Sequence, residues 1–115
     1  MEFDTYDNGV ASGDPNGNHI GIDLNGSINS VVTAVIPIRF NNGQVWYAWV
    51  DYNGSVIEAR VSQTNSRPAT PSVAFPVTLA AVLGTSTAFV GFTGGTGAGF
   101  ENHDILSWQF NDAFA

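Results

Sequence analysis

The chain has 115 residues, of which 43% are hydrophobic and 11% charged, with thirteen glycines, eight phenylalanines and no cysteine. This length and composition fit one globular, β-rich domain, and they exclude a disordered chain, a disulfide framework and a zinc–thiolate site. Three arginines stand against ten acids for a formal charge of −7, and no apolar run approaches the roughly 18 residues of a membrane span, so we expect neither a nucleic-acid nor a membrane partner.

Strand predictions follow one another at short spacing, with turn signals between them and no convincing helical period. Asn53-Gly54 is expected to join two strands as a two-residue hairpin, because Asn-Gly accepts the positive φ angles of a type I′ turn. Leu79–Leu83 is expected to form one short helical turn before Gly84. The predicted strands are Glu2–Tyr6, Asn18–Leu24, Ser30–Ile36, Val45–Tyr52, Ser55–Ser62, Ser72–Val77, Thr87–Thr93 and His103–Phe110.

The first predicted strand and the loop after it gather side chains that bind divalent cations. Glu2 and Asp4 are two positions apart on an extended chain, so both carboxylates point to one face. Oxygen ligands suit calcium, whereas carboxylates mixed with one imidazole nitrogen suit manganese or a similar transition ion. Two adjacent metals that share Asp4 and Asp14 would use every candidate ligand at once. These candidates are Glu2, Asp4, Tyr6, Asn8, Asp14 and His19.

An acidic surface strand followed by a solvated turn is the structural alternative for this block. Two observations favour a metal site. The polar loop between Asp4 and His19 is too long to order itself cheaply without a ligand, and the carboxylates of Glu2, Asp4 and Asp14 would repel one another without a cation. Ligation needs deprotonated carboxylates and a neutral His19, so we expect metal affinity to fall on acidification.

The last part of the chain carries a glycine-rich loop between two predicted strands. Val90-Gly91-Phe92 precedes Thr96-Gly97-Ala98-Gly99, and the stretch from His103 to Phe110 follows. No lysine or helix follows the loop, so it is not a phosphate-binding loop. Together with the acidic block, these motifs resemble the metal-binding segment, last loop and closing strand of the legume-type (L-type) lectins. The likeness is closest to lectin-like domains of bacterial proteins.

The resemblance implies an all-β, antiparallel β-sandwich of the lectin-like jelly-roll type. It also implies carbohydrate binding that depends on calcium and on manganese or another transition metal, with no catalytic residue. On the family pattern the transition metal takes Glu2, Asp4, Asp14 and His19. Calcium takes Asp4, the backbone carbonyl of Tyr6, Asn8 and Asp14. Sugar binding falls to Tyr6, Asn8 and the backbone N–H groups of Ala98 and Gly99.

An L-type lectin domain is about twice this length, and its acidic block normally lies near the middle. Residues 1–115 are therefore expected to form a single half-domain, without the family's principal sugar-binding aspartate. Two copies could cover each other's open sheets, so we expect a homodimer or higher homo-oligomer with a carbohydrate partner. Members of the family are mostly secreted or extracellular, but no location is predicted from the residues themselves.

Two other functions stay open at this level. A metal-stabilised structural or assembly module would keep the scaffold but not the sugar site. Some glycoside hydrolases of the same sandwich type also open their catalytic strand with Glu-x-Asp, but they need a second glutamate just beyond it. Tyr6 or Asp7 stands there in this chain, so we expect no catalysis.

Overall fold

A computed structural model describes residues 1–113 of the chain. Short strands dominate it, with one 3-10 turn between the first two strands and one α-helical turn after the last. Within the described residues, no helix is long and apolar enough to cross a membrane. The elements are β1 (Glu2–Asp4), η1 (Val10–Ser12), β2 (His19–Ile22), β3 (Val32–Val35), β4 (Tyr47–Tyr52), β5 (Val56–Ser62), β6 (Val73–Pro76) and α1 (Leu79–Leu83).

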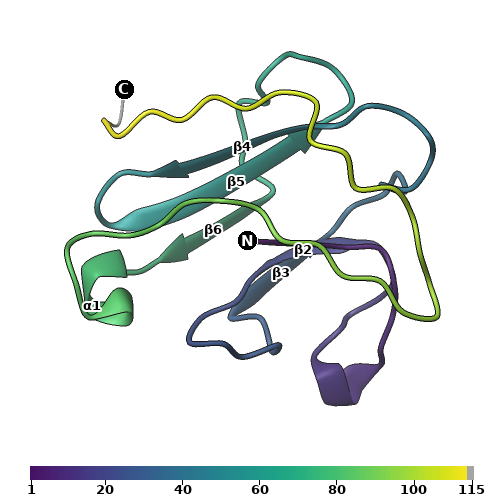
Figure 1. Ribbon diagram of the computed structural model, residues 1–115, viewed down its shortest axis with the longest axis horizontal. Helices are drawn as coiled ribbons and strands as arrows, with labels where there is room; N and C mark the ends of the chain where they lie inside the picture. Colours follow the sequence, from purple (N-terminus) through teal and green to yellow (C-terminus); the bar gives the residue numbers. More distant parts are fainter. Residues whose placement is uncertain (114–115) are drawn as a thin grey trace.

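The strands form two antiparallel sheets of three strands each, in the orders β1-β2-β3 and β4-β5-β6. Strands that are hydrogen-bonded to each other are therefore also consecutive in the sequence. The two sheets contact each other where β2 and β3 meet β6 (Figure 1). The predicted all-β, antiparallel sandwich is confirmed.

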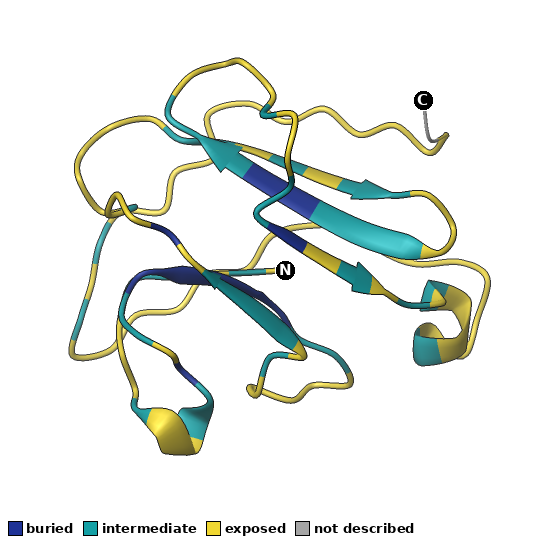
Figure 2. Cartoon of the chain, turned by 180° about the vertical axis from the view of Figure 1, so that it is seen from behind, coloured by how far each residue is buried: buried dark blue, intermediate teal, exposed yellow. Residues whose placement is uncertain are grey.

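The core lies between the sheets and is small. All four residues of β2 are buried, and the burial continues into the middle of β5 and the start of β6 (Figure 2). β2 is the central strand of its sheet, and its sequence His-Ile-Gly-Ile includes one buried polar side chain, His19. The buried apolar residues are Ile20, Ile22, Ile36, Ala59 and Val73.

The predicted hairpin between β4 and β5 is confirmed, but its type I′ turn is wrong. Only Gly54 has a positive φ, of 94°, while the side-chain oxygen of Asn53 accepts the N–H groups of Ser55 and Val56. That side chain closes the turn in place of a second left-handed residue. Two consecutive positive φ angles occur instead at Asn25-Gly26, with values of 56° and 70°, in a turn that the Ser27 N–H closes on the Leu24 carbonyl.

Two strand predictions are wrong. The segments Thr87–Thr93 and His103–Phe110 join neither sheet and run past both as an irregular chain (Figure 1). Their large apolar side chains, such as Phe89, Ile105 and Leu106, are exposed. Alternating side chains make a strand only when a neighbouring backbone supplies the ladder hydrogen bonds, and none of the described strands pairs with these segments.

Candidate metal centre

The pairing of β1 with β2 builds one side of the centre. Glu2 is opposite Gly21 and Asp4 is opposite His19 in the antiparallel register. Side chains of directly opposed residues project from the same face of a sheet, so both carboxylates lie on the face that His19 occupies. Gly21 leaves room there, because a Cβ at this position would lie 2.5 Å from the Ser30 hydroxyl oxygen.

The loop between β1 and β2 supplies the fourth group. It contains the 3-10 turn η1, which ends at Gly13 with a left-handed φ of 80°. This reversal folds the chain back and leaves Asp14 only 8% exposed. The backbone N–H of Asn8 donates to Asp14 Oδ2 at 2.7 Å, which holds together the two segments that flank η1.

Four of the six predicted metal ligands converge, with Glu2, Asp4 and Asp14 placed around His19. Its Nε2 lies 3.8 Å from Glu2 Oε1 and 3.9 Å from both Asp4 Oδ2 and Asp14 Oδ1. One ligand atom from each of the four residues lies within 4.8 Å of all the others. Atoms that bind one cation at about 2.0 to 2.6 Å lie at most about 4 to 5 Å apart, so the cluster has the size of a single metal site.

The ring of His19 is oriented as a ligand. Its Nδ1 lies 2.9 Å from the backbone oxygen of Asn16, and a carbonyl only accepts, so Nδ1 carries the proton in the neutral ring and the Nε2 lone pair faces the carboxylates. Charge-assisted hydrogen bonds are about 2.7 to 2.9 Å long, and all three Nε2–oxygen distances are longer. Acceptor atoms that face one another without a shared proton fit a cation at their centre.

The electrostatics of Glu2 point the same way. Burial, followed by the neighbouring carboxyl groups of Asp4 and Asp23, raises the pKa of Glu2 to about 7. The Ser30 hydroxyl donates to Glu2 Oε2 at 3.1 Å, which opposes the rise. Ser30 therefore contacts Glu2, one of the candidate metal ligands, directly. A bound cation would favour the charged carboxylate.

The predicted carbohydrate residues line one cavity beside this cluster. Tyr6, Asn8, Ala98 and Gly99 all contribute to its wall, and its volume is about 530 Å³. Gly99 lies against the Tyr6 ring so closely that a Cβ on it would be 2.6 Å from Tyr6 Cδ2. The structure therefore brings together two sequence motifs from opposite ends of the chain.

The same cavity contains two residues that sequence reasoning missed, Glu101 and His103. The signal available in the sequence was their position directly after the glycine-rich loop. We assigned His103 to a strand, which concealed its place in the wall, and no sequence pattern linked Glu101 to the opposite end of the chain.

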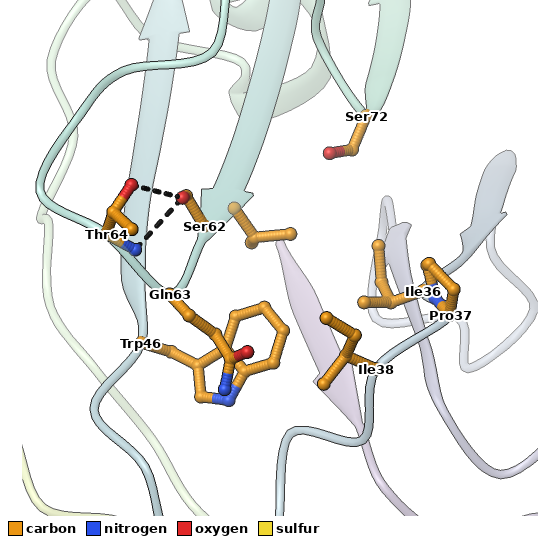
Figure 3. Close-up of a pocket in the computed structure, with 9 residues that line it drawn as sticks. Ile36, Pro37, Ile38, Trp46, Ser62, Gln63, Thr64 and Ser72 are labelled. Carbon is orange, nitrogen blue, oxygen red and sulfur yellow. Dashed lines mark hydrogen bonds between the residues drawn. The ribbon is translucent and has the colours of Figure 1, made fainter.

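A second cavity, of about 380 Å³, lies away from the cluster and is lined mainly by apolar residues (Figure 3). Trp46 forms part of it and packs edge-on against Phe40 at 4.9 Å between ring centroids. The buried Nε1 of Trp46 has no hydrogen-bond partner among the described residues. No ionisable side chain lines this cavity, so we assign it no chemistry.

The antiparallel sandwich, with an acid–histidine cluster formed by β1, β2 and the loop between them, is consistent with the class of lectin-type β-sandwich domains. The legume lectin domain family matches residues 1–115, and the chain belongs to this family. The L-type resemblance of the sequence is thereby confirmed at the level of the family.

Relatives of the chain include plant proteins from Arabidopsis thaliana. It is 34% identical to the probable L-type lectin-domain containing receptor kinase VII.2, over 98% of this chain and 18% of that protein. With L-type lectin-domain containing receptor kinase VIII.2 it shares 35% identity, over 99% of this chain and 16% of the kinase. The lectin-like protein At1g53060 is 29% identical, over 98% of this chain and 52% of its own length. The chain thus spans from under a fifth to about half of these relatives.

Proposed function

We propose that this chain is a non-catalytic carbohydrate-binding domain that holds calcium beside manganese or a similar transition ion. The convergence of three carboxylates on the lone pair of His19 carries the proposal, because it leaves a cation-sized centre next to a polar cavity. Membership of the legume lectin domain family supports the carbohydrate class.

Each metal would take a distinct set of the chain's own groups. Asp4 and Asp14 face the cluster with one oxygen each, and their other oxygens accept the backbone N–H groups of Tyr6 and Asn8 at 2.7 Å. Both aspartates are therefore placed between the histidine and the loop that would hold calcium. Bound ions would neutralise the carboxylates and hold the loop in one conformation. The transition-metal set is Glu2, Asp4, Asp14 and His19, and the calcium set is Asp4, the carbonyl of Tyr6, Asn8 and Asp14.

The cavity next to the loop offers the groups that a sugar needs. The Tyr6 ring is a platform for the apolar face of a pyranose. The Asn8 amide can both donate to hydroxyls and accept from them. Within residues 1–113, the N–H groups of Ala98 and Gly99 donate to no other group, so they are available to a ligand.

Calorimetric titration tests the proposal. The chain stripped with a chelator is titrated with Mn²⁺ and then Ca²⁺, and the loaded protein is titrated with a panel of methyl glycosides and applied to a glycan array. We expect saturable metal binding and glycan binding that disappears after chelation. Metal binding without any glycan binding would contradict the lectin function and favour the assembly module.

We further propose that residues 1–115 correspond to the C-terminal half of an L-type lectin domain and associate as a homodimer. Coverage of about half of a lectin-like relative supports a half-domain, and the assignment to the C-terminal half rests on the resemblance of the chain's motifs. Exposed aromatic and aliphatic side chains outside the sheets, including Phe89, Phe92 and Trp108, support the second, because uncovered apolar area favours association. The expected kinship with bacterial domains stays a prediction.

A further inference from the structure

Glu101 reaches the sugar cavity from the opposite end of the chain. The hydroxyl of Thr5 donates to Glu101 Oε1, which joins positions 96 residues apart. The side chain of Glu101 is 18% exposed, and Nε2 of His103 lies 4.0 Å from the same Oε1. These contacts hold the carboxyl group at the wall that also contains Tyr6 and Asn8.

Glu101 is the one charged hydrogen-bond acceptor in the described cavity wall that does not belong to the metal cluster. Of the carboxylates in its wall, Glu2 and Asp4 belong to the metal cluster. Glu101 is the remaining one, and no described residue donates to its Oε2. An ionised carboxylate has about four acceptor sites, so Glu101 keeps acceptor capacity after its bond from Thr5.

We infer that Glu101 is a specificity-determining residue that accepts hydrogen bonds from the hydroxyls of a saccharide bound in this cavity. The inference rests on the proposed lectin function and deepens it. The donors Ala98 N–H and Gly99 N–H lie on the same wall as this acceptor. Adjacent sugar hydroxyls, each both donor and acceptor, can bond to such a mixed wall. A neutral saccharide is the ligand class, because a uronic or sialic acid would meet the Glu101 carboxylate and a chain of net charge −7.

The test uses the metal-loaded chain of 115 residues and the variant Glu101→Gln, which removes the charge but keeps an oxygen for Thr5. Asp104→Asn is the matched control, since Asp104 is exposed and lies outside the cavity wall. Methyl α-mannoside, methyl α-glucoside and methyl β-galactoside are the probes. Glu101→Gln should weaken the probe that binds the parent chain about ten- to hundredfold, the range for hydrogen bonds to charged groups. Asp104→Asn should leave its affinity unchanged.

A second variant separates ligand contact from loop position. Thr5→Val removes the hydroxyl that holds Glu101 and leaves the carboxylate, so it should weaken binding less than Glu101→Gln. Mn²⁺ affinity, measured in parallel, should stay at the parent value in all variants. Parent-like sugar affinity in Glu101→Gln, equal losses in Thr5→Val and Glu101→Gln, or a matching loss of Mn²⁺ affinity would each overturn the inference while the lectin function stands. If the parent chain binds Mn²⁺ but none of the probes or arrayed glycans, the lectin function itself fails, and this inference with it.

Discussion

His19 sits on the central strand of its sheet, 1% exposed, with Nδ1 held by a backbone carbonyl and Nε2 directed at three carboxylates. A buried polar side chain is costly unless its hydrogen bonds are made. Only one of the two ring nitrogens has a hydrogen-bond partner among the described residues. The other nitrogen, Nε2, faces the three carboxylates without a hydrogen bond in the described part of the chain. No other single residue indicates a cation site here as strongly.

Asp4→Asn is expected to remove most of the metal-dependent stabilisation, because Asp4 contributes to both proposed metal sites. A ligand that binds only the folded state at 100 times its Kd stabilises that state by about 2.7 kcal/mol. The melting temperature with and without Mn²⁺ and Ca²⁺ measures this difference. Asp7→Asn is the control, since the Asp7 side chain is exposed and, within residues 1–113, accepts a hydrogen bond only from the Gly9 N–H. Equal metal-dependent shifts in both variants would contradict the shared-ligand assignment.

The pH dependence should have opposite signs with and without metal. In the metal-free chain the pKa of Glu2 is raised from 4.5 to about 7, so the folded state disfavours the charged form. The free energy of unfolding should therefore fall as pH rises from about 4.5 through about 7. Metal must displace that proton, so Mn²⁺ affinity should instead rise over the same range.

Urea titrations of the chelated protein and calorimetry with Mn²⁺ at several pH values measure the two slopes. Glu2→Gln should flatten the metal-free slope. A metal-free chain that becomes steadily more stable across this pH range would contradict the raised pKa of Glu2.

At the scale of elements, β2 holds the fold and the site together. It pairs with β1 on one side and β3 on the other, and it contributes Ile20 and Ile22 to the core beside the ligand His19. The histidine is therefore positioned by the same strand that contributes two of the five buried apolar residues of the core. Loss of core packing and loss of metal binding should be coupled for this reason.

Ile20→Ala should lower the free energy of unfolding by about 2 to 5 kcal/mol, because it leaves a cavity at a fully buried position. Ile28→Ala serves as the control, since Ile28 is 65% exposed and should change stability by less than about 0.5 kcal/mol. Chemical denaturation of the metal-loaded protein gives both values. Comparable losses in the two variants would mean that β2 is not the centre of the core.

For the whole molecule, the exposed apolar segment after α1 predicts association. Sedimentation at low micromolar concentration should show a dimer or a higher homo-oligomer. Trp108→Glu should shift the mass toward the monomer, because it places a charge among the exposed aromatic contacts of Trp108 with Phe92 and Phe110. A well-folded monomer of the parent chain at that concentration would contradict the homodimer.

The lectin assignment also predicts no glycosidase turnover. Glu2 and Asp4 both face His19 Nε2 within 4 Å, so their carboxylates are occupied in the cluster and are not free to flank a glycosidic bond. Incubation with soluble β-glucans should release no reducing ends. Cleavage that Glu2→Gln abolished would replace the lectin function with a hydrolase function.

The order and identity of residues 2 to 19 were enough to predict that Glu2, Asp4, Asp14 and His19 gather in one cluster. Their role as metal ligands stays a prediction. Ligand chemistry depends on residue type, and the two-residue period of a strand fixes which carboxylates share a face. The same local reasons predicted α1 and the hairpin at Asn53-Gly54. The turn type was missed because the Asn53 side chain, and not a second positive φ, closes the turn.

Only the tertiary structure decided which conformation and contacts the last third of the chain adopts. Alternation predicted strands at Thr87–Thr93 and His103–Phe110, but a ladder also requires a partner backbone, and periodicity carries no information about a partner. The same limit applied to Glu101, whose place beside Thr5 depends on a contact across 96 positions. Local chemistry determined the ligands of the proposed metal centre, and long-range folding determined which side chains completed the cavity beside it.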